Sequence, residues 1–479
     1  MATRLVTALA VSAILGVPAG AADLPLKAPP PVTAYSWSGF YIGANAGYGV
    51  ARNPSSSTYT GSHGESFNLA PHGAFGGGQI GYNWQAPPSW VFGIEADIQA
   101  AAQKDSTTCV NLCIPPDVYT RVSQKLSWFG TLRGRLGWTN GPTLFYATGG
   151  LAYGEVATDY SISNAPGPDA HSFSRTKTGW TIGGGVETQL AGHWTAKIEY
   201  LYIDLGNLTD VFVYTPDPAT SVVNTSHIRN HVARLGLNYK FGGPVYVAAA
   251  PGGGFVKAPV AVAAFNWSGF YLGTNVGYGV ARDPSQSTVS SGGIGLSFDS
   301  FNLSPRGVLG GAQIGYNWQV APNWVFGIET DIQASAQTDG TTCVRFCQSV
   351  LITRASQKLP WFGTLRGRLG WTNGPALFYA TGGLAYGQVT TDYTITTLPA
   401  VVVQRNFSHT KTGWTAGGGI EARLAGNWTA KAEYLYIDLG KVNDSFGYPP
   451  DPFISLAETS AIRNHIARVG LNYKFENTR

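Results

Sequence analysis

The fold is decided by a ten-residue stretch, WVFGIEADIQ, that runs from Trp90 to Gln99. Every second residue is apolar, so Trp90, Phe92 and Ile94 share one side of an extended chain and Glu95 and Asp97 share the other. Alternation with period two is typical of a β-strand with one apolar face. Seven more such stretches occur before Phe241, starting near residues 37, 72, 121, 142, 175, 193 and 228.

The connections between these stretches alternate strictly in length. Short turns fall at residues 85–88, 140–141 and 191–192, and long polar segments fall at 51–71, 102–120, 158–174 and 207–227. Bacterial outer-membrane barrels have this arrangement, with short periplasmic turns, long extracellular loops and strands of ~10 residues. The competing interpretation is a soluble sandwich or lipocalin-like barrel, whose polar face meets water and should be heavily charged. Here that face is mostly Gly, Thr, Asn and Ser, which favours the membrane barrel.

The whole pattern occurs twice in the 479 residues. WSGFY starts at Trp37 and again at Trp267, and GTLRGRLGW starts at Gly130 and again at Gly363. We therefore expect two barrel units, residues 37–241 and 267–475. A Pro-rich leader (22–36) precedes the first, a periplasmic linker (242–266) joins them, and a tail (476–479) follows the second.

Composition and the first residues point to an exported membrane protein. Only 12% of residues are charged, against ~25% in a typical soluble domain, and the net charge of +4 is too small for a disordered chain. The 31 Lys and Arg are scattered among 27 Asp and Glu, unlike the clustered charge of nucleic-acid binders. Residues 1–21 combine Arg4, an apolar run and a small-residue cleavage site, as in a signal peptide.

Tryptophan recurs where strands meet the short turns, as expected for an aromatic girdle at one lipid interface. The predicted girdle consists of Trp37, Trp84, Trp90, Trp138, Trp194, Phe241, Trp267, Trp318, Trp324, Trp371, Trp428 and Phe475. The other four tryptophans, Trp128, Trp180, Trp361 and Trp414, lie about one strand length further along. Ten residues separate Trp128 from Trp138, which spans roughly 25 Å of a tilted strand, the height of a lipid-facing band.

Several motifs together resemble the alphaproteobacterial outer-membrane immunogenic proteins, which are related to opacity-type eight-stranded surface barrels. These motifs are WSGFY at Trp37, YATGGLAYG at Tyr146, EYLYIDLG at Glu199 and the closing LNYKF that ends at Phe241. The resemblance covers nearly the whole chain, once per unit. It implies an envelope component, surface antigen or adhesin of a Gram-negative cell, with haem binding known in a few relatives. In that family the chain ends at the closing Phe, which serves as a signal to the barrel-assembly machinery. This sequence departs from the pattern, because Phe241 lies in mid-chain and Glu476 to Arg479 follow Phe475.

If the tryptophan side of each strand faces lipid, a balanced set of charges faces the lumen. In the first unit these residues are Glu95, Asp97, Arg133, Arg135, Glu187, Lys197, Glu199 and Arg234. The second unit repeats them as Glu329, Asp331, Arg366, Arg368, Glu421, Lys431, Glu433 and Arg468 and adds Arg423. A narrow lumen cannot hydrate isolated charges, so we favour a salt-bridged plug over an ion-selective constriction.

No motif predicts catalysis, a cofactor or a metal site. Only His231 and His465 recur between the units, and neither has a suitably placed nucleophile. Two cysteine pairs, Cys109 with Cys113 and Cys343 with Cys347, lie in the second expected long loop of each unit. We expect local disulfides there, because the exported compartment is oxidising.

We therefore predict an all-β protein of the cell outer membrane, not an enzyme, built as two tandem eight-stranded antiparallel up-and-down barrels. Its predicted role is structural or surface-interacting, through long extracellular loops. The expected partners are outer-membrane lipid and lipopolysaccharide, the assembly machinery and a host or surface ligand. The main alternative is a porin-type diffusion channel formed as one 16-stranded barrel, and a minor alternative is haem or small-ligand binding at the loops.

Overall fold

A computed structural model of the chain describes residues 33–60, 65–87, 89–114, 118–163, 169–215, 218–241, 245–246, 265–292, 294–342, 351–397, 400–448 and 451–475. Within these ranges no helix is long and apolar enough to cross a membrane. The expected signal peptide and the tail lie outside the described residues, as do most of the leader and the linker.

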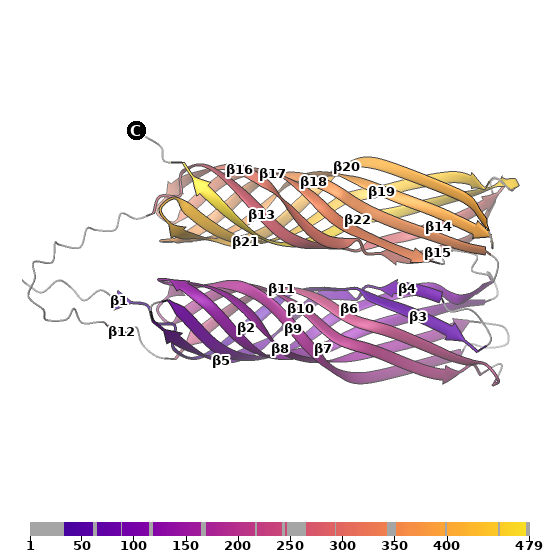
Figure 1. Cartoon of the computed structure of the whole chain (residues 1–479), viewed down its shortest axis with the longest axis horizontal. Coiled ribbons are helices and arrows are strands. Elements are labelled where there is room, and N and C mark those ends of the chain that lie inside the picture. Colours follow the sequence, from indigo (N-terminus) through magenta and orange to yellow (C-terminus); the bar gives the residue numbers. More distant parts are fainter. Residues whose placement is uncertain are drawn as a thin grey trace, which may run out of the picture. The chain divides into compact units, whose positions relative to one another are not determined.

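The first unit forms a closed ring of eight antiparallel strands, here called barrel 1 (Figure 1). Its strands are β2 (Gly39–Ala51), β5 (His72–Ala86), β6 (Trp90–Ile114), β7 (Val118–Asn140), β8 (Thr143–Ser163), β9 (Asp169–Ala191), β10 (Trp194–Val213) and β11 (Ser221–Lys240). Each strand pairs with its sequence neighbours, and β11 closes the ring by pairing with β2 from Lys240 opposite Tyr41 to Asn230 opposite Ala51.

The second unit forms another closed ring, barrel 2, with the same order. Its strands are β13 (Gly269–Ala281), β16 (Arg306–Ala321), β17 (Trp324–Thr342), β18 (Leu351–Asn373), β19 (Ala376–Thr397), β20 (Ala400–Ala425), β21 (Trp428–Tyr448) and β22 (Asp451–Lys474). Pairing of β22 with β13 closes this ring. The prediction of two eight-stranded barrels is confirmed, because each ring closes on its own strands and the 16-stranded arrangement does not form.

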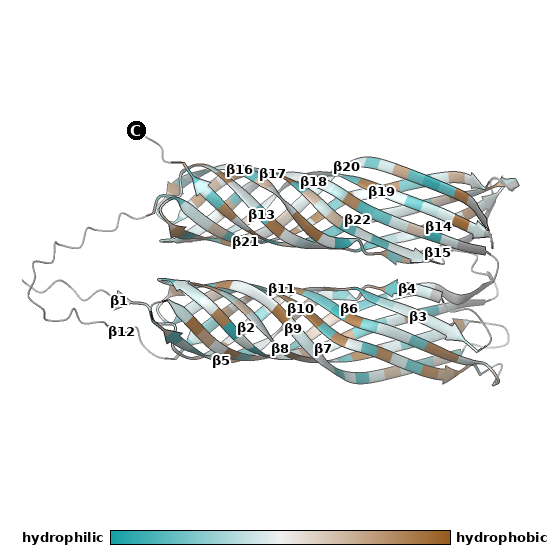
Figure 2. Ribbon diagram, in the orientation of Figure 1, coloured by the Kyte–Doolittle hydropathy of each residue, from teal (hydrophilic) through white to brown (hydrophobic). Residues whose placement is uncertain are grey.

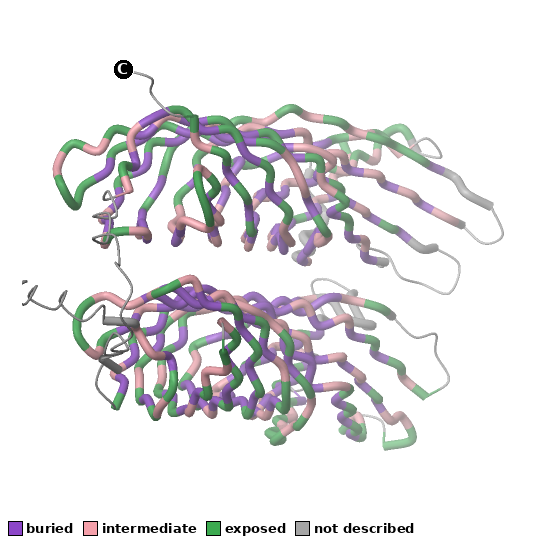
Figure 3. The backbone as a smooth tube through the Cα atoms, turned by 60° about the vertical axis from the view of Figure 1, so that its left-hand side comes forward, coloured by how far each residue is buried: buried purple, intermediate pink, exposed green. Residues whose placement is uncertain are grey.

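The strands reverse the arrangement of a soluble protein, because their apolar side chains face outward and their polar side chains face the lumen. In β6 the apolar residues Phe92, Ile94 and Ile98 are exposed, whereas the polar residues Glu95 and Asp97 between them are buried. The alternation of hydropathy (Figure 2) and of burial (Figure 3) along the strands shows this arrangement in both barrels. Lipid on the outside would cover the apolar face.

Tight turns connect the strands at the end where the predicted girdle lies. Asn140-Gly141 joins β7 to β8, and Gly141 has a φ of 60°, a left-handed conformation that glycine adopts without strain. Asn373-Gly374 repeats this turn in barrel 2, with a φ of 63° at the glycine.

The opposite end corrects the expectation of long loops. Most of residues 102–120, 158–174 and 207–227 continue the strands, and residues 51–71 form a hairpin of β3 (Asn53–Tyr59) and β4 (Glu65–Leu69) that extends from β11. The hairpin of β14 (Asp283–Ser291) and β15 (Ile294–Leu303) repeats this in barrel 2. Alternation does not stop at the lipid boundary: Tyr160 and Ile162 of β8 point inward and pack with Phe212. Ladder hydrogen bonds and this packing hold the segments as strands.

A separate two-stranded piece comes from the expected leader and linker. There β1 (Thr33–Ala34) pairs antiparallel with β12 (Val245–Tyr246).

Candidate functional site

The lumen of barrel 1 contains a layer of eight charged side chains, all of them buried. Strand register places opposite charges directly across from each other: Glu95 faces Arg133, Lys197 faces Glu187 and Glu199 faces Arg234. Such cross-strand pairs are favourable on a sheet face. The layer is built by β6, β7, β9, β10 and β11, which carry these residues at inward positions.

Arg133 is the hub of the layer. Its Nη1 donates to Oε1 of Glu199 at 2.9 Å and its Nη2 donates to Oδ2 of Asp97 at 2.9 Å. Nη2 also donates to Glu95. Because Glu199 comes from β10 and the other two carboxylates come from β6, one guanidinium ties separate parts of the wall together.

Arg234 and Lys197 complete the network around these three carboxylates. Arg234 donates from Nε to Glu199 at 2.6 Å and from Nη2 to Asp97 at 2.9 Å. The ammonium group of Lys197 lies 2.8 Å from both carboxylate oxygens of Glu95. Each carboxylate therefore meets at least one cation, as a charge in a site sealed from water requires.

Arg135 forms a second tier, closer to the short turns. Its Nη2 donates to Glu187 at 2.8 Å and its Nη1 donates to the hydroxyl of Tyr41 at 3.0 Å. That hydroxyl in turn donates to Glu95 at 2.8 Å, so Tyr41 links the two tiers. The guanidinium also lies 4.0 Å from the ring centre of Tyr146, a cation–π contact.

Barrel 2 repeats the main contacts of the layer. Arg366 donates to Glu433 at 2.9 Å and to Asp331 at 3.0 Å, and Arg368 donates to Glu421 at 2.7 Å. The remaining members, Glu329, Lys431 and Arg468, are buried in the same network. Arg423 is not part of it, because its Nε donates to the carbonyl of Gly426 in the adjoining turn.

An apolar layer lies above the charges, toward the end away from the short turns. In barrel 1 it contains Phe75, Phe129, Leu201, Ile203 and Leu205, all of them buried. Barrel 2 has the matching cluster around Phe362 and Leu435. Leu201 and Ile203 follow Lys197 and Glu199 on the inward side of β10, so the same strand lines both layers.

Trp37 and Trp267 correct the girdle prediction. Their side chains are 0% and 1% exposed, whereas Trp90 is 47% exposed. Trp37 precedes β2, so its side chain is not fixed to the outer face of the wall; it packs on Val91, Leu144 and Tyr146 inside the barrel end. Its indole N–H donates to the carbonyl of Gly141 at 3.2 Å.

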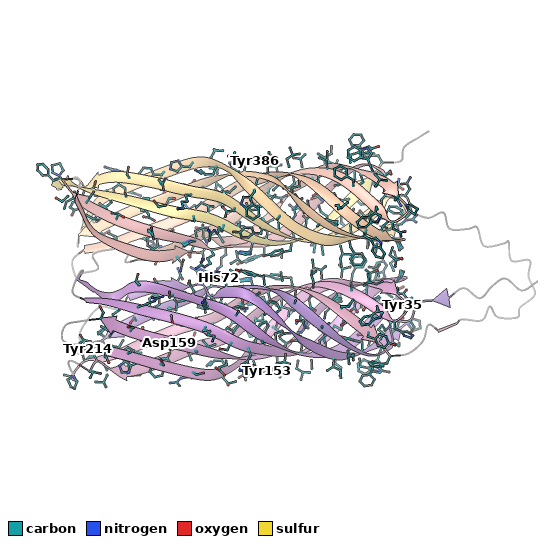
Figure 4. The ribbon with its side chains drawn as sticks, turned by 180° about the vertical axis from the view of Figure 1, so that it is seen from behind. Tyr35, His72, Tyr153, Asp159, Tyr214 and Tyr386 are labelled. Carbon is teal, nitrogen blue, oxygen red and sulfur yellow. The ribbon has the colours of Figure 1, made fainter. Side chains whose placement is uncertain are left out.

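The remaining girdle residues lie on the outside of the strands, mostly half exposed. They are Trp84, Trp90, Trp138, Trp194, Phe241, Trp318, Trp324, Trp371, Trp428 and Phe475. Figure 4 shows aromatic side chains gathered at this end of the barrels, near the labelled Tyr35.

Sequence reasoning missed the neutral partners of the charges. Tyr41, Tyr146, Thr195 and Asn238 all bond to layer carboxylates. Each of these side chains occupies an inward-facing position of its strand, so the period-two alternation of the sequence could have identified them. The apolar layer was missed because inward positions were assumed to be polar.

The remaining sequence candidates add no chemistry. His231 and His465 bond to the hydroxyl groups of Tyr200 and Tyr434, each at 2.6 Å. Among the described residues no cluster of His, Cys, Asp and Glu could hold a metal ion. The side chains of all four cysteines lie outside the described part of the structure, so the disulfides stay a prediction.

Comparison with known families and proteins agrees with the barrel architecture. The model of the outer membrane protein beta-barrel domain matches residues 7–241 and again 248–475. The chain is 41% identical over 224 residues to the 31 kDa outer-membrane immunogenic protein of Brucella melitensis, which takes in 46% of this chain and 89% of that protein. It is 32% identical over 171 residues to the 22 kDa outer membrane protein of Rhizobium leguminosarum, which takes in 35% of this chain and 64% of that protein.

Solved structures give weaker matches. Neisserial surface protein A is 16% identical, with a TM-score of 0.20 over 43% of this chain and 98% of its own. A FadL homologue of Pseudomonas aeruginosa is 10% identical, with a TM-score of 0.26 over 91% of each chain. Likeness at this level supports no functional conclusion.

Proposed function

Because the chain belongs to the outer membrane protein beta-barrel family, we propose that it is a closed surface barrel protein of the outer membrane, which presents extracellular structure and does not conduct solutes. The observation that carries this proposal is the filling of both lumens by a charge layer and an apolar layer.

Steric and electrostatic arguments both support a closed lumen. Eight strands enclose a space just wide enough for side chains. An ion that passed through barrel 1 would have to separate Arg133 from Glu199 and then enter the apolar layer around Phe129. Breaking a buried ion pair costs about 3–5 kcal/mol when one partner is left alone.

The extracellular part supports the surface role. Beyond the level of Trp128 and Trp180, the strands continue as a hydrogen-bonded sheet. Its outward positions include Ser161, Thr209 and Thr225. A polar surface fixed by ladder hydrogen bonds suits recognition by antibodies or surface ligands, because little chain entropy is lost on binding. We place the surface antigen or adhesin role here, with outer-membrane lipid around the barrel and the assembly machinery as its biogenesis partner.

The porin-type alternative has less support. A wide aqueous lumen would need the two rings to merge, whereas each ring is closed by a ladder of its own, β11 with β2 and β22 with β13.

Labelling of intact cells tests the surface placement. In a background with the four cysteines replaced by serine, Ser161→Cys should react with a membrane-impermeant maleimide, because Ser161 is exposed on the extracellular part of β8. Ala250→Cys in the linker is the matched control and should react only after the outer membrane is broken. Labelling of Ala250→Cys in intact cells, or protection of Ser161→Cys, would overturn the proposed orientation.

A further inference from the structure

Two lysines stand side by side on the outside of barrel 1. Lys104 of β6 and Lys125 of β7 are directly opposite each other in the strand register, and both side chains are exposed. Arg121 lies on the same face, opposite Thr108, and donates from Nη2 to Ser106 at 3.0 Å. The face thus carries three cations within two neighbouring strands.

This arrangement is unfavourable without an anion. Like charges directly opposite each other destabilise a sheet, and among the described residues neither lysine has a carboxylate within 4.0 Å. Of the nearest acidic side chains on β8, Glu155 already accepts from Trp128 at 3.1 Å and from Ser174 at 3.0 Å. Asp159 faces Ser123 and is the other acidic residue among the described outward positions of this part of β8. The cations therefore outnumber the available carboxylates.

The position of the lysines relative to the lipid-facing band determines which anion could reach them. Trp128 faces Ala100 at the upper tryptophan level, and the Lys104–Lys125 pair follows only a few positions further from the membrane. That places the ammonium groups roughly 5–10 Å beyond the apolar band, within the headgroup region of a bilayer. Figure 4 shows Tyr153, a ring neighbour of Trp128 at 6.1 Å, and Asp159 farther toward the extracellular end.

We propose that Lys104 and Lys125 bind the phosphate of a phosphorylated glycolipid in the outer leaflet. Facing positions on a sheet have Cβ atoms ~5 Å apart, so two long side chains can reach one phosphate from both sides. Headgroup phosphate lies at this height, and its charge relieves the repulsion between the lysines. The inference rests on the outer-membrane location and on the proposed orientation of the barrel, and not on whether the lumen conducts.

Barrel 2 is a natural control. Thr338 occupies the position of Lys104, so Lys358 faces a threonine. The ammonium group of Lys358 lies 3.5 Å from Asp392, which already balances its charge. The proposal therefore assigns the lipid site to barrel 1 only.

Native mass spectrometry of the full chain in detergent can test this with bis-phosphorylated lipid A as the probe. We expect Lys104→Gln/Lys125→Gln to weaken lipid A binding by about tenfold or more, because each lysine near an anionic surface contributes ~1 kcal/mol. Lys358→Gln should change binding by less than about twofold, as for an exposed ion pair of small energy. Thr338→Lys, which builds a second lysine pair, should add a bound lipid.

Three results would overturn the proposal. They are unchanged lipid A affinity in the double variant together with no gain in Thr338→Lys, equal binding of dephosphorylated lipid A, and displacement of lipid A by millimolar inorganic phosphate. The last result would identify a site for free anions. Heat-modifiable migration on gels confirms that each variant is folded before its affinity is compared.

Discussion

At the scale of single residues, the stability of the barrel depends on an oppositely charged partner for each buried charge of the lumen. Arg133 bonds to three carboxylates, and all three are buried. Removal of the guanidinium strands those carboxylates in a site of low dielectric constant.

We therefore expect Arg133→Ala to lower the free energy of unfolding of the full chain by about 3–5 kcal/mol. Urea titration in lipid vesicles, followed by gel mobility, measures it. Arg121→Ala is the control, since Arg121 is exposed, and its effect should stay within ~0.5 kcal/mol. Equal effects of the two changes would mean that the lumen is hydrated.

A titratable group lies in the proposed extracellular part of barrel 2. Glu458 is sixteen residues from Lys474, so it lies roughly 40 Å along the barrel and beyond the ~25 Å lipid band. Burial raises the pKa of Glu458 to about 8, and the charge of Asp444 adds to the effect, while a hydrogen bond from Tyr393 opposes it. Asp444 faces Glu458 directly and also lies 2.7 Å from His409.

The pH dependence follows from this raised pKa. Between pH ~4.5 and ~8 the folded state holds a proton that the unfolded state has lost, so stability decreases as pH rises through this window. Hydrogen exchange in β21 and β22 near Glu458 should be faster at pH 8.5 than at pH 5, after correction for the intrinsic rate. Glu458→Gln should remove the excess. The equivalent region of barrel 1 should show a smaller change, because burial raises the pKa of Asp210 there but Asn224 opposite it does not titrate. The same change in both barrels would refute the assignment.

Residue parity predicted the charge layer but not the burial of Trp37 and Trp267 inside the barrel ends. The inward charges could be named because each lies within a strand whose alternation is regular. Trp37 could not be placed this way, because it precedes the ladder of β2 and its position depends on contacts with Val91 and Leu144, far away in the sequence.

At the scale of elements, the strands are longer than a lipid bilayer requires. Polar segments such as residues 158–163 are predicted from the sequence as loops because they contain Ser, Thr and Asp. Their inward residues Tyr160 and Ile162 nevertheless find partners on neighbouring strands. Strand pairing over such distances is a tertiary effect, so the turn lengths of one sequence cannot reveal it.

Amide hydrogen exchange tests these extensions. Thr158 and Tyr160 pair with β7 and β9 on both sides, so we expect their amides to be protected as strongly as those near Leu151, within about tenfold. Exchange at the rate of an unstructured peptide in residues 157–162 would restore the loop interpretation.

At the scale of the whole molecule, two self-sufficient barrels share one chain. Each has its own closing ladder, charge layer and buried tryptophan, Trp37 or Trp267, and these follow from a repeat that is plain in the sequence. The sequence did not decide between two rings and one, because the first and last strands of a unit could pair within it or outside it. The closing registers decide it, with Asn238 opposite Gly43 and Asn472 opposite Gly273.

Independent folding follows from independent closure. We expect residues 22–241 expressed alone to refold in detergent into a heat-modifiable barrel, since no strand of the ring is contributed by residues 267–475. Residues 242–479 form the matched half and should behave alike. A half that refolds only when the other half is present would contradict two autonomous rings.

The most direct test of the closed lumen is the conductance of the full chain in a planar lipid bilayer. The filled layers predict no steady conductance steps above the bare bilayer, even when gel mobility shows that the inserted protein is folded. A large and stable conductance from folded, full-length protein would contradict the account and make the protein a pore.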